Sequence, residues 1–101
     1  MKLFDSHAHY YDERFGEEVD GGADAVLSSV FLGDVKKIVN VGTCNENSQK
    51  CIEQAAKYEG MYAAVGIHPS DCRFYTDVES ELSILTNDLS AISFIERSLF
   101  L

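Results

Sequence analysis

The spacing of apolar residues predicts strands along the first two thirds of the chain. Residues 3–9 suit an extended strand, and 38–42 and 61–67 are short apolar runs of the kind that form buried strands. The last of these ends at His68-Pro69, because proline has no N–H with which to continue a strand ladder. A later apolar run, 91–95, is a candidate fourth strand.

Helical patterns separate these strands. Apolar residues recur at intervals of three and four in the segments 23–31, 48–58 and 78–85. Asp20-Gly21-Gly22 provides a breaker with a candidate N-cap before the first helix, and Gly33 provides a stop after it. Thr76-Asp77-Val78-Glu79 fits a capping box before the third helix, with Thr76 as the cap. The segments that are predicted to be loops are 10–20 and 70–75.

The order of these elements, β-α-β-α-β-α-β, is typical of an α/β fold with a parallel sheet and right-handed crossovers. Hydrophobic residues make up 46% of the chain, which is the composition of a globular rather than a disordered protein. The sequence has no internal repeat, low-complexity tract or interdomain linker, so residues 1–101 are interpreted as one domain or part of one.

The opening strand carries the candidate chemistry. Leu3, Asp5, His7 and His9 share one parity, so their side chains point to one face of an extended strand. Two imidazoles two residues apart can bind one metal ion through neutral ring nitrogens, and Asp5 is placed to accept a hydrogen bond that fixes a ring tautomer. His-x-His pairs also occur by chance, so the motif alone leaves surface or core roles open.

Two further residues follow predicted strand ends, where parallel α/β folds collect their functional groups. His68 is one, so that all three histidines of the chain fall at such ends. A turn residue before proline is the equally weighted alternative for His68. Cys44 is the other, but no base or orienting residue is identified for it, so a cysteine nucleophile is disfavoured.

Charge and cysteine content narrow the class of protein. Seventeen acidic and eight basic residues give a net charge of -9, which argues against a non-specific nucleic-acid-binding protein. Bound metal ions could still supply the local positive charge needed to handle phosphates. Cys44, Cys51 and Cys72 form no C-x-x-C pair, which favours free thiols in a reducing compartment. Without a basic leader or a membrane-spanning apolar run, we expect a cytoplasmic protein with no membrane partner.

Three motifs in register resemble a known family. Phe4-Asp5-Ser6-His7-Ala8-His9, Val39-Asn40-Val41-Gly42-Thr43 and Ala63-Ala64-Val65-Gly66-Ile67-His68-Pro69 occur in this order at the right intervals. Together they resemble the N-terminal part of the TatD family of metal-dependent hydrolases, often described as TatD-type deoxyribonucleases. The resemblance covers residues 2 to about 90.

The resemblance implies the N-terminal portion of a TIM (β/α)8 barrel of the metal-dependent hydrolase (amidohydrolase-like) type, with about three to four β/α units present. One or two divalent metal ions (Mg, Mn or Zn) would lie at the carboxyl face, with His7 and His9 as ligands. The metal would activate water to cleave a phosphodiester of DNA or another phosphoester substrate. His68 would bind near the substrate phosphate, and no residue of the chain is assigned as a catalytic acid or base.

Two departures from the family pattern change these expectations. Phe94 stands where the family has a metal-bridging glutamate, and Glu96 could replace it only if the strand slipped by two residues. A full barrel needs roughly 250 residues, so residues 1–101 are interpreted as an incomplete, truncated domain with weak or absent hydrolytic activity. The alternatives are a non-catalytic module that self-associates through an open sheet edge, or an amidohydrolase-type enzyme acting on a different bond.

Overall fold

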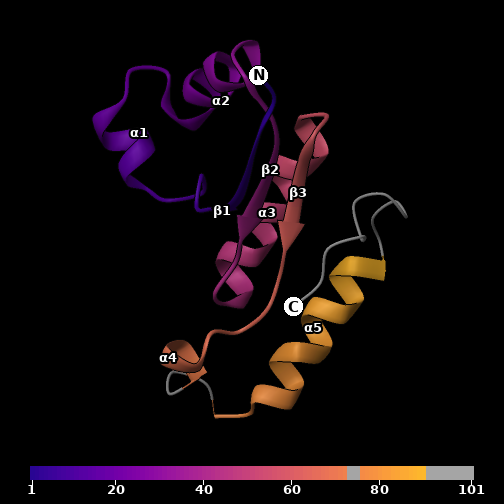
Figure 1. The fold of residues 1–101 in the computed structure, drawn as a ribbon. Helices are drawn as coiled ribbons and strands as arrows, with labels where there is room; N and C mark the ends of the chain where they lie inside the picture. The colour runs from indigo at the N-terminus through magenta and orange to yellow at the C-terminus, as the bar shows by residue number, and fades with distance from the viewer. Residues whose placement is uncertain (73–75, 91–101) are drawn as a thin grey trace.

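A parallel sheet of three strands forms the centre of the fold (Figure 1). The computed structural model describes residues 1–72 and 76–90. Within them, β1 (Leu3–Ala8), β2 (Val35–Val41) and β3 (Met61–Ala64) lie in the order β1-β2-β3, and both neighbouring pairs are parallel. The predicted α/β fold with a parallel sheet is therefore confirmed. The candidate strand at 91–95, with Phe94 and Glu96, lies outside the described residues.

Helices connect these strands and follow them. They are α1 (Arg14–Glu18), α2 (Gly22–Leu32), α3 (Asn45–Lys57), α4 (Pro69–Cys72) and α5 (Val78–Ser90). The last of them lies against α3, where the side-chain amide of Asn45 donates a hydrogen bond of 3.0 Å to the carbonyl oxygen of Glu81. Within the described ranges, no helix combines the length and apolar character that a membrane crossing requires.

Most of the buried side chains gather on the face of the sheet where α2 and α3 pack. Two clusters form this core, one of Ala8, Leu27, Ile38 and Met61 and one of Cys51, Ile52, Ala55, Ala63 and Val65. Successive side chains of a strand alternate between the two faces, so the burial of Ala8 turns its neighbour His7 to the opposite face. His7 is accordingly exposed, at the carboxyl end of β1.

The third strand is shorter than the predicted 61–67. After β2 ends at Val41, the N–H of Gly42 donates a 2.8 Å hydrogen bond to the carbonyl of Ala64, and the chain turns into α3. Residues 65–67 therefore have no further β2 backbone with which to form a ladder. Instead, the N–H of His68 donates to the carbonyl of Thr43 at 2.7 Å, which keeps the end of this segment beside the turn after β2.

Two short helices lie where loops were predicted. The first, α1, begins where the Asp12 carboxylate accepts the backbone N–H of Arg14 at 3.0 Å, which satisfies a donor that a helix start leaves unpaired. The second, α4, begins at Pro69, where the fixed φ of proline suits the first helical position and its missing N–H costs nothing. Both are single turns, too short to produce a helical period in the sequence.

The structure also defines the caps of α2 and α5, and the predicted cap of α5 is wrong. Within the predicted breaker at residues 20–22, the N-cap of α2 is Gly21, and its φ of 85° lies in the left-handed region that favours glycine. Before α5, Asp77 rather than Thr76 takes the capping position. One oxygen of its carboxylate accepts the N–H of Ser80 at 3.2 Å and the other accepts the Ser80 hydroxyl at 2.8 Å.

Candidate metal centre

The imidazoles of His7 and His9 lie side by side at the carboxyl end of β1. Their ring centroids are 5.0 Å apart and the ring planes meet at 76°. Imidazoles that share one tetrahedral ion, each with a nitrogen about 2.0–2.1 Å from it, have ring centroids about 5 Å apart. The separation therefore suits a shared ion, and the two rings lie together as the alternation along an extended strand predicts.

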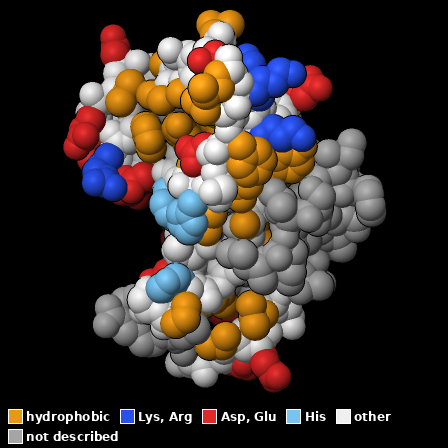
Figure 2. Space-filling model, in the orientation of Figure 1, with side chains coloured by type: hydrophobic (Ala, Val, Ile, Leu, Met, Phe, Trp, Pro, Cys, Tyr) orange, Lys and Arg blue, Asp and Glu red, His pale blue; other side chains and the backbone are white. Residues whose placement is uncertain are grey.

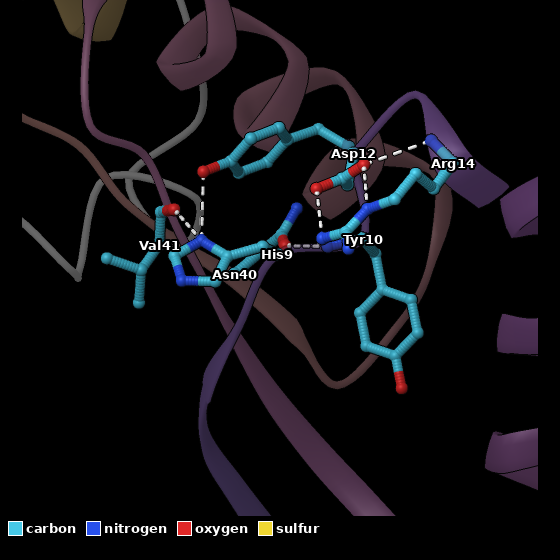
Figure 3. Close-up of polar contacts among 7 residues, drawn as sticks. His9, Tyr10, Asp12, Arg14, Asn40 and Val41 are labelled. Carbon is cyan, nitrogen blue, oxygen red and sulfur yellow. Dashed lines mark hydrogen bonds and ion pairs between the residues drawn. The ribbon is translucent and has the colours of Figure 1, made fainter.

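The carbonyl of Val41 decides which nitrogen of His9 is available. Its oxygen lies 2.8 Å from His9 Nδ1 (Figure 3), and a carbonyl can only accept, so Nδ1 carries the proton and donates. A neutral His9 is then left with a lone pair on Nε2. A backbone carbonyl that holds one ring nitrogen while the other binds metal is a recurrent arrangement around metal-ligating histidines.

Tyr11 provides a second contact to the same nitrogen. Its hydroxyl lies 2.8 Å from His9 Nδ1, and the two rings pack edge to face with centroids 5.6 Å apart. Burial raises the pKa of the Tyr11 phenol to about 12, and nearby Cys51 adds to the rise. Tyr11 therefore stays a neutral phenol at physiological pH and fixes the ring without adding charge.

Asp5 contacts the main chain at this site. Its carboxylate accepts the backbone N–H of His7 at 3.2 Å, two residues along the chain. The ring contact that its parity suggested is made for His9 by Val41 and Tyr11 instead. The carbonyl could not be found in the sequence, because every residue carries one and only the register of β2 against β1 selects Val41.

His68 lines the same cleft as the pair on β1. The cleft has a volume of about 590 Å3, and its walls include His7, His9 and His68 together with Gly42 and Thr43. Histidine side chains border the hollow in Figure 2. The structure thus brings all three histidines of the chain to one cleft, although His68 lies four residues beyond the end of β3.

The ring of His68 is held in the opposite sense from that of His9. The backbone N–H of Ser70 donates to His68 Nδ1 at 3.1 Å, and the Ser70 hydroxyl lies 2.8 Å from the same atom. Since Nδ1 accepts from the backbone, a neutral His68 carries its proton on Nε2. That N–H is suited to a hydrogen bond with an anionic oxygen.

Among the described residues, no group of three or more His, Cys, Asp or Glu side chains converges on one point. The described part of the cleft therefore brings together the His7–His9 pair and the imidazole of His68. These groups lie at the carboxyl edge of a parallel sheet, which is where metal-binding α/β enzymes place their reactive groups.

Comparison with known proteins shows the family to which the chain belongs. The sequence model of the family described as TatD related DNase matches residues 4–95, and the chain belongs to this family. An uncharacterized metal-dependent hydrolase of Buchnera aphidicola is 26% identical to it, over 95% of this chain and 36% of the relative. YabD of Bacillus subtilis is 33% identical over 68% of this chain and 26% of its own length. YjjV of Escherichia coli is 30% identical over 79% and 29%.

All three relatives are named as uncharacterized metal-dependent hydrolases. The chain spans between about a quarter and about a third of the length of these relatives. The match runs from Phe4 in β1 through α5, and it includes every histidine of the site.

Proposed function

We propose that this chain supplies the first-strand metal ligands of a metal-dependent hydrolase that cleaves phosphodiester bonds of DNA. One arrangement carries the proposal. The ring centroids of His7 and His9 lie 5.0 Å apart, and the hydrogen bond to Val41 leaves Nε2 of His9 available as the ligand atom. Membership of the TatD related DNase family supports both the hydrolase class and the choice of DNA.

The donor set fits a divalent ion. His7 and His9 offer neutral nitrogen ligands, which suit zinc and its neighbours among the transition metals. A divalent ion held there would lower the pKa of a water molecule and polarise a phosphoryl oxygen. Two imidazoles without a carboxylate are a weak set, so we expect weak metal binding and little or no hydrolysis by the isolated chain.

His68 is the proposed substrate-binding residue. Ser70 holds the proton of neutral His68 on Nε2, and the ring lines the cleft that also contains the two proposed ligands. An N–H donor in this cleft would hydrogen-bond to a phosphate oxygen and orient the phosphodiester. The proposed role needs only the Nε2–H of a neutral ring, so it requires no charge on His68.

The wider fold that we propose is a (β/α)8 barrel, of which β1, β2 and β3 would be the first strands. Parallel strands with their helices packed on one face support this, because the barrel repeats that unit. In such a barrel the face that carries His7 would point toward the axis, and the exposed edge of β1 would be paired by another strand.

A second candidate function is self-association through the open edge of the sheet. In the described sheet β1 has a neighbour on one side only, and its Leu3 and Phe4 are 47% and 58% exposed. Unpaired strands with apolar side chains favour pairing with a second chain. Light scattering on the eluting peak of a gel-filtration column tests this, since a monomer at all concentrations would exclude it.

Calorimetric titration of the full chain with zinc and manganese tests the metal proposal. We expect binding that weakens by about tenfold or more in His7→Ala and in His9→Ala, because each removes one of two ligands. His68→Ala is the matched control and should leave the metal affinity unchanged. Binding that survives both ligand substitutions would overturn the proposal.

The substrate proposal needs a separate measurement. With metal present, His68→Ala should weaken the binding of a fluorescent single-stranded DNA oligonucleotide, since it removes the proposed phosphate contact. The loss should not depend on base sequence, because phosphates carry no sequence information. Equal DNA affinity in wild type and His68→Ala would remove His68 from the site.

A further inference from the structure

We propose that Asn40 and Gln54 form a polar clamp on the backbone of Tyr10 and thereby position His9 as a metal ligand. The proposal rests on the proposed metal site, and it assigns a positioning role to two residues outside the lining of the cleft. Neither residue is among those that line it.

The clamp is a closed set of three hydrogen bonds. Asn40 Oδ1 accepts the backbone N–H of Tyr10 at 2.8 Å (Figure 3), and Asn40 Nδ2 donates to Gln54 Oε1 at 2.7 Å. Gln54 Nε2 then donates to the carbonyl of Tyr10 at 3.1 Å. Both polar backbone groups of Tyr10 are thus bound by side chains, one from β2 and one from α3.

Burial makes this arrangement rigid. Asn40 is 0% exposed, so any of its polar atoms left without a partner would cost the full desolvation penalty. The amide orientation is also fixed, since only one way of placing oxygen and nitrogen satisfies all three contacts. The Tyr10 backbone cannot move without breaking a hydrogen bond to one of these two side chains.

The clamp acts where the strand ladder stops. The last paired residue of β1 is Ala8, which faces Asn40, and the chain leaves the strand before His9. Two consecutive residues of β2 then hold two consecutive residues of the departing chain. Val41 binds the His9 ring through its carbonyl, and Asn40 binds the Tyr10 backbone through its side chain. The ring contact depends on the backbone contact, because Tyr10 is bonded directly to His9.

Gln54→Met tests the clamp with little change in side-chain volume. It removes both hydrogen bonds of Gln54 while the helix and the cleft residues stay intact. Gln49→Met is the matched control, because Gln49 is exposed on the same helix. Gln54→Ala is a second variant that removes the same hydrogen bonds with the residue of highest helix propensity. Circular dichroism establishes that each variant folds.

Two readouts separate positioning from general stability. Zinc affinity should fall by about tenfold in Gln54→Met and remain at the wild-type value in Gln49→Met, as for other partners that orient a ligand. In the metal-free protein, nitrogen-detected NMR of the imidazoles should show the Nδ1–H form of His9 averaging with the other tautomer. The methyl signals of Ile38 and Ile52 should not shift.

Zinc affinity and His9 tautomer both unchanged in Gln54→Met would overturn the clamp. If the wild-type chain binds no zinc, the metal proposal fails by itself, and the metal-free NMR spectrum still decides the clamp. If His9 no longer favours the Nδ1–H tautomer in Gln54→Met, the clamp is supported. If His9 retains that preference in the variant, the clamp is overturned.

Discussion

His9 and His68 line one cleft, and each binds the protein through the same ring nitrogen, Nδ1, but in opposite hydrogen-bonding senses. Nδ1 of His9 donates to the carbonyl of Val41, whereas Nδ1 of His68 accepts the backbone N–H of Ser70. A neutral His9 therefore turns a lone pair toward its surroundings through Nε2, and a neutral His68 turns an N–H. One backbone group at each histidine therefore suits His9 to bind a metal ion and His68 to donate a hydrogen bond.

This relationship predicts opposite tautomers in the metal-free protein. With both rings in their neutral form, nitrogen NMR of the folded chain should find the proton on Nδ1 in His9 and on Nε2 in His68. The control is the same chain in denaturant, in which all the histidines should give one averaged pattern. The same tautomer at both positions would contradict the assigned hydrogen bonds.

Tyr11→Phe should change the zinc affinity only slightly, in contrast to the loss of zinc affinity expected when the clamp is broken. Val41 still accepts the His9 proton when the hydroxyl is absent, so zinc affinity should change by less than about threefold. The lost hydrogen bond should lower the free energy of unfolding by about 0.5–1.5 kcal/mol. Urea denaturation and calorimetry measure the two quantities. A tenfold loss of affinity would show that the hydroxyl, rather than the carbonyl, holds the ring.

Gly42→Ala should destabilise the fold. A Cβ at this position would overlap the Ser48 hydroxyl and lie 2.7 Å from the Ser48 Cα, and Ser48 is itself buried. Forcing a methyl group into such a site costs about 1–3 kcal/mol. Gly16→Ala is the control, because nothing lies within 4 Å of its added Cβ. Chemical denaturation of both variants should show a loss for the first and none for the second.

Cys51 should resist alkylation in the folded chain. Burial, with a smaller effect from Cys44, raises the pKa of its thiol to about 12, so the reactive thiolate is scarce at physiological pH. Iodoacetamide labelling at about pH 8, followed by peptide mass spectrometry, should find Cys51 modified slowly. Labelling in denaturant should abolish the protection. Rapid labelling under native conditions would mean that α3 does not stay packed on the sheet.

The pKa of the Asp12 carboxyl should rise when the Arg14 side chain is removed. Hydrogen bonds from the Arg14 side chain and backbone lower the pKa of the Asp12 carboxyl from 3.8 to about 2. Because the pKa of Asp12 is lower in the folded chain than in the unfolded chain, its ionised carboxylate stabilises the fold at pH values above the unfolded pKa. That contribution is lost as pH falls from about 4 toward 2.

Carbon NMR titration of Asp12 tests this prediction. In Arg14→Ala the pKa of the carboxyl should rise toward its ordinary value, because the side-chain hydrogen bonds and the positive charge are removed. Lys57→Ala is a suitable control, since Lys57 pairs with Asp24 instead. An Asp12 pKa that is already ordinary in the wild type would show that the Asp12–Arg14 pair does not persist in solution.

The sequence by itself determined the alternation of strands and helices and the pairing of His7 with His9. Both follow from local periodicity, since a two-residue period sets the face of a strand and a three-to-four-residue period sets the face of a helix. The stop at Gly33 is likewise a local signal, and α2 does end there. The single-turn helices α1 and α4 are too short for such periods to register.

Only the tertiary structure decided which ring nitrogens are free, where β3 ends and what holds Tyr10. Val41 lies 32 positions from His9 in the sequence, and Gln54 lies 44 positions from Tyr10. Their groups are an ordinary carbonyl and an ordinary amide, which acquire a role through the register of β2 beside β1 and the packing of α3. Periodicity is a property of neighbouring residues, whereas these contacts exist only once the sheet and its helices have assembled.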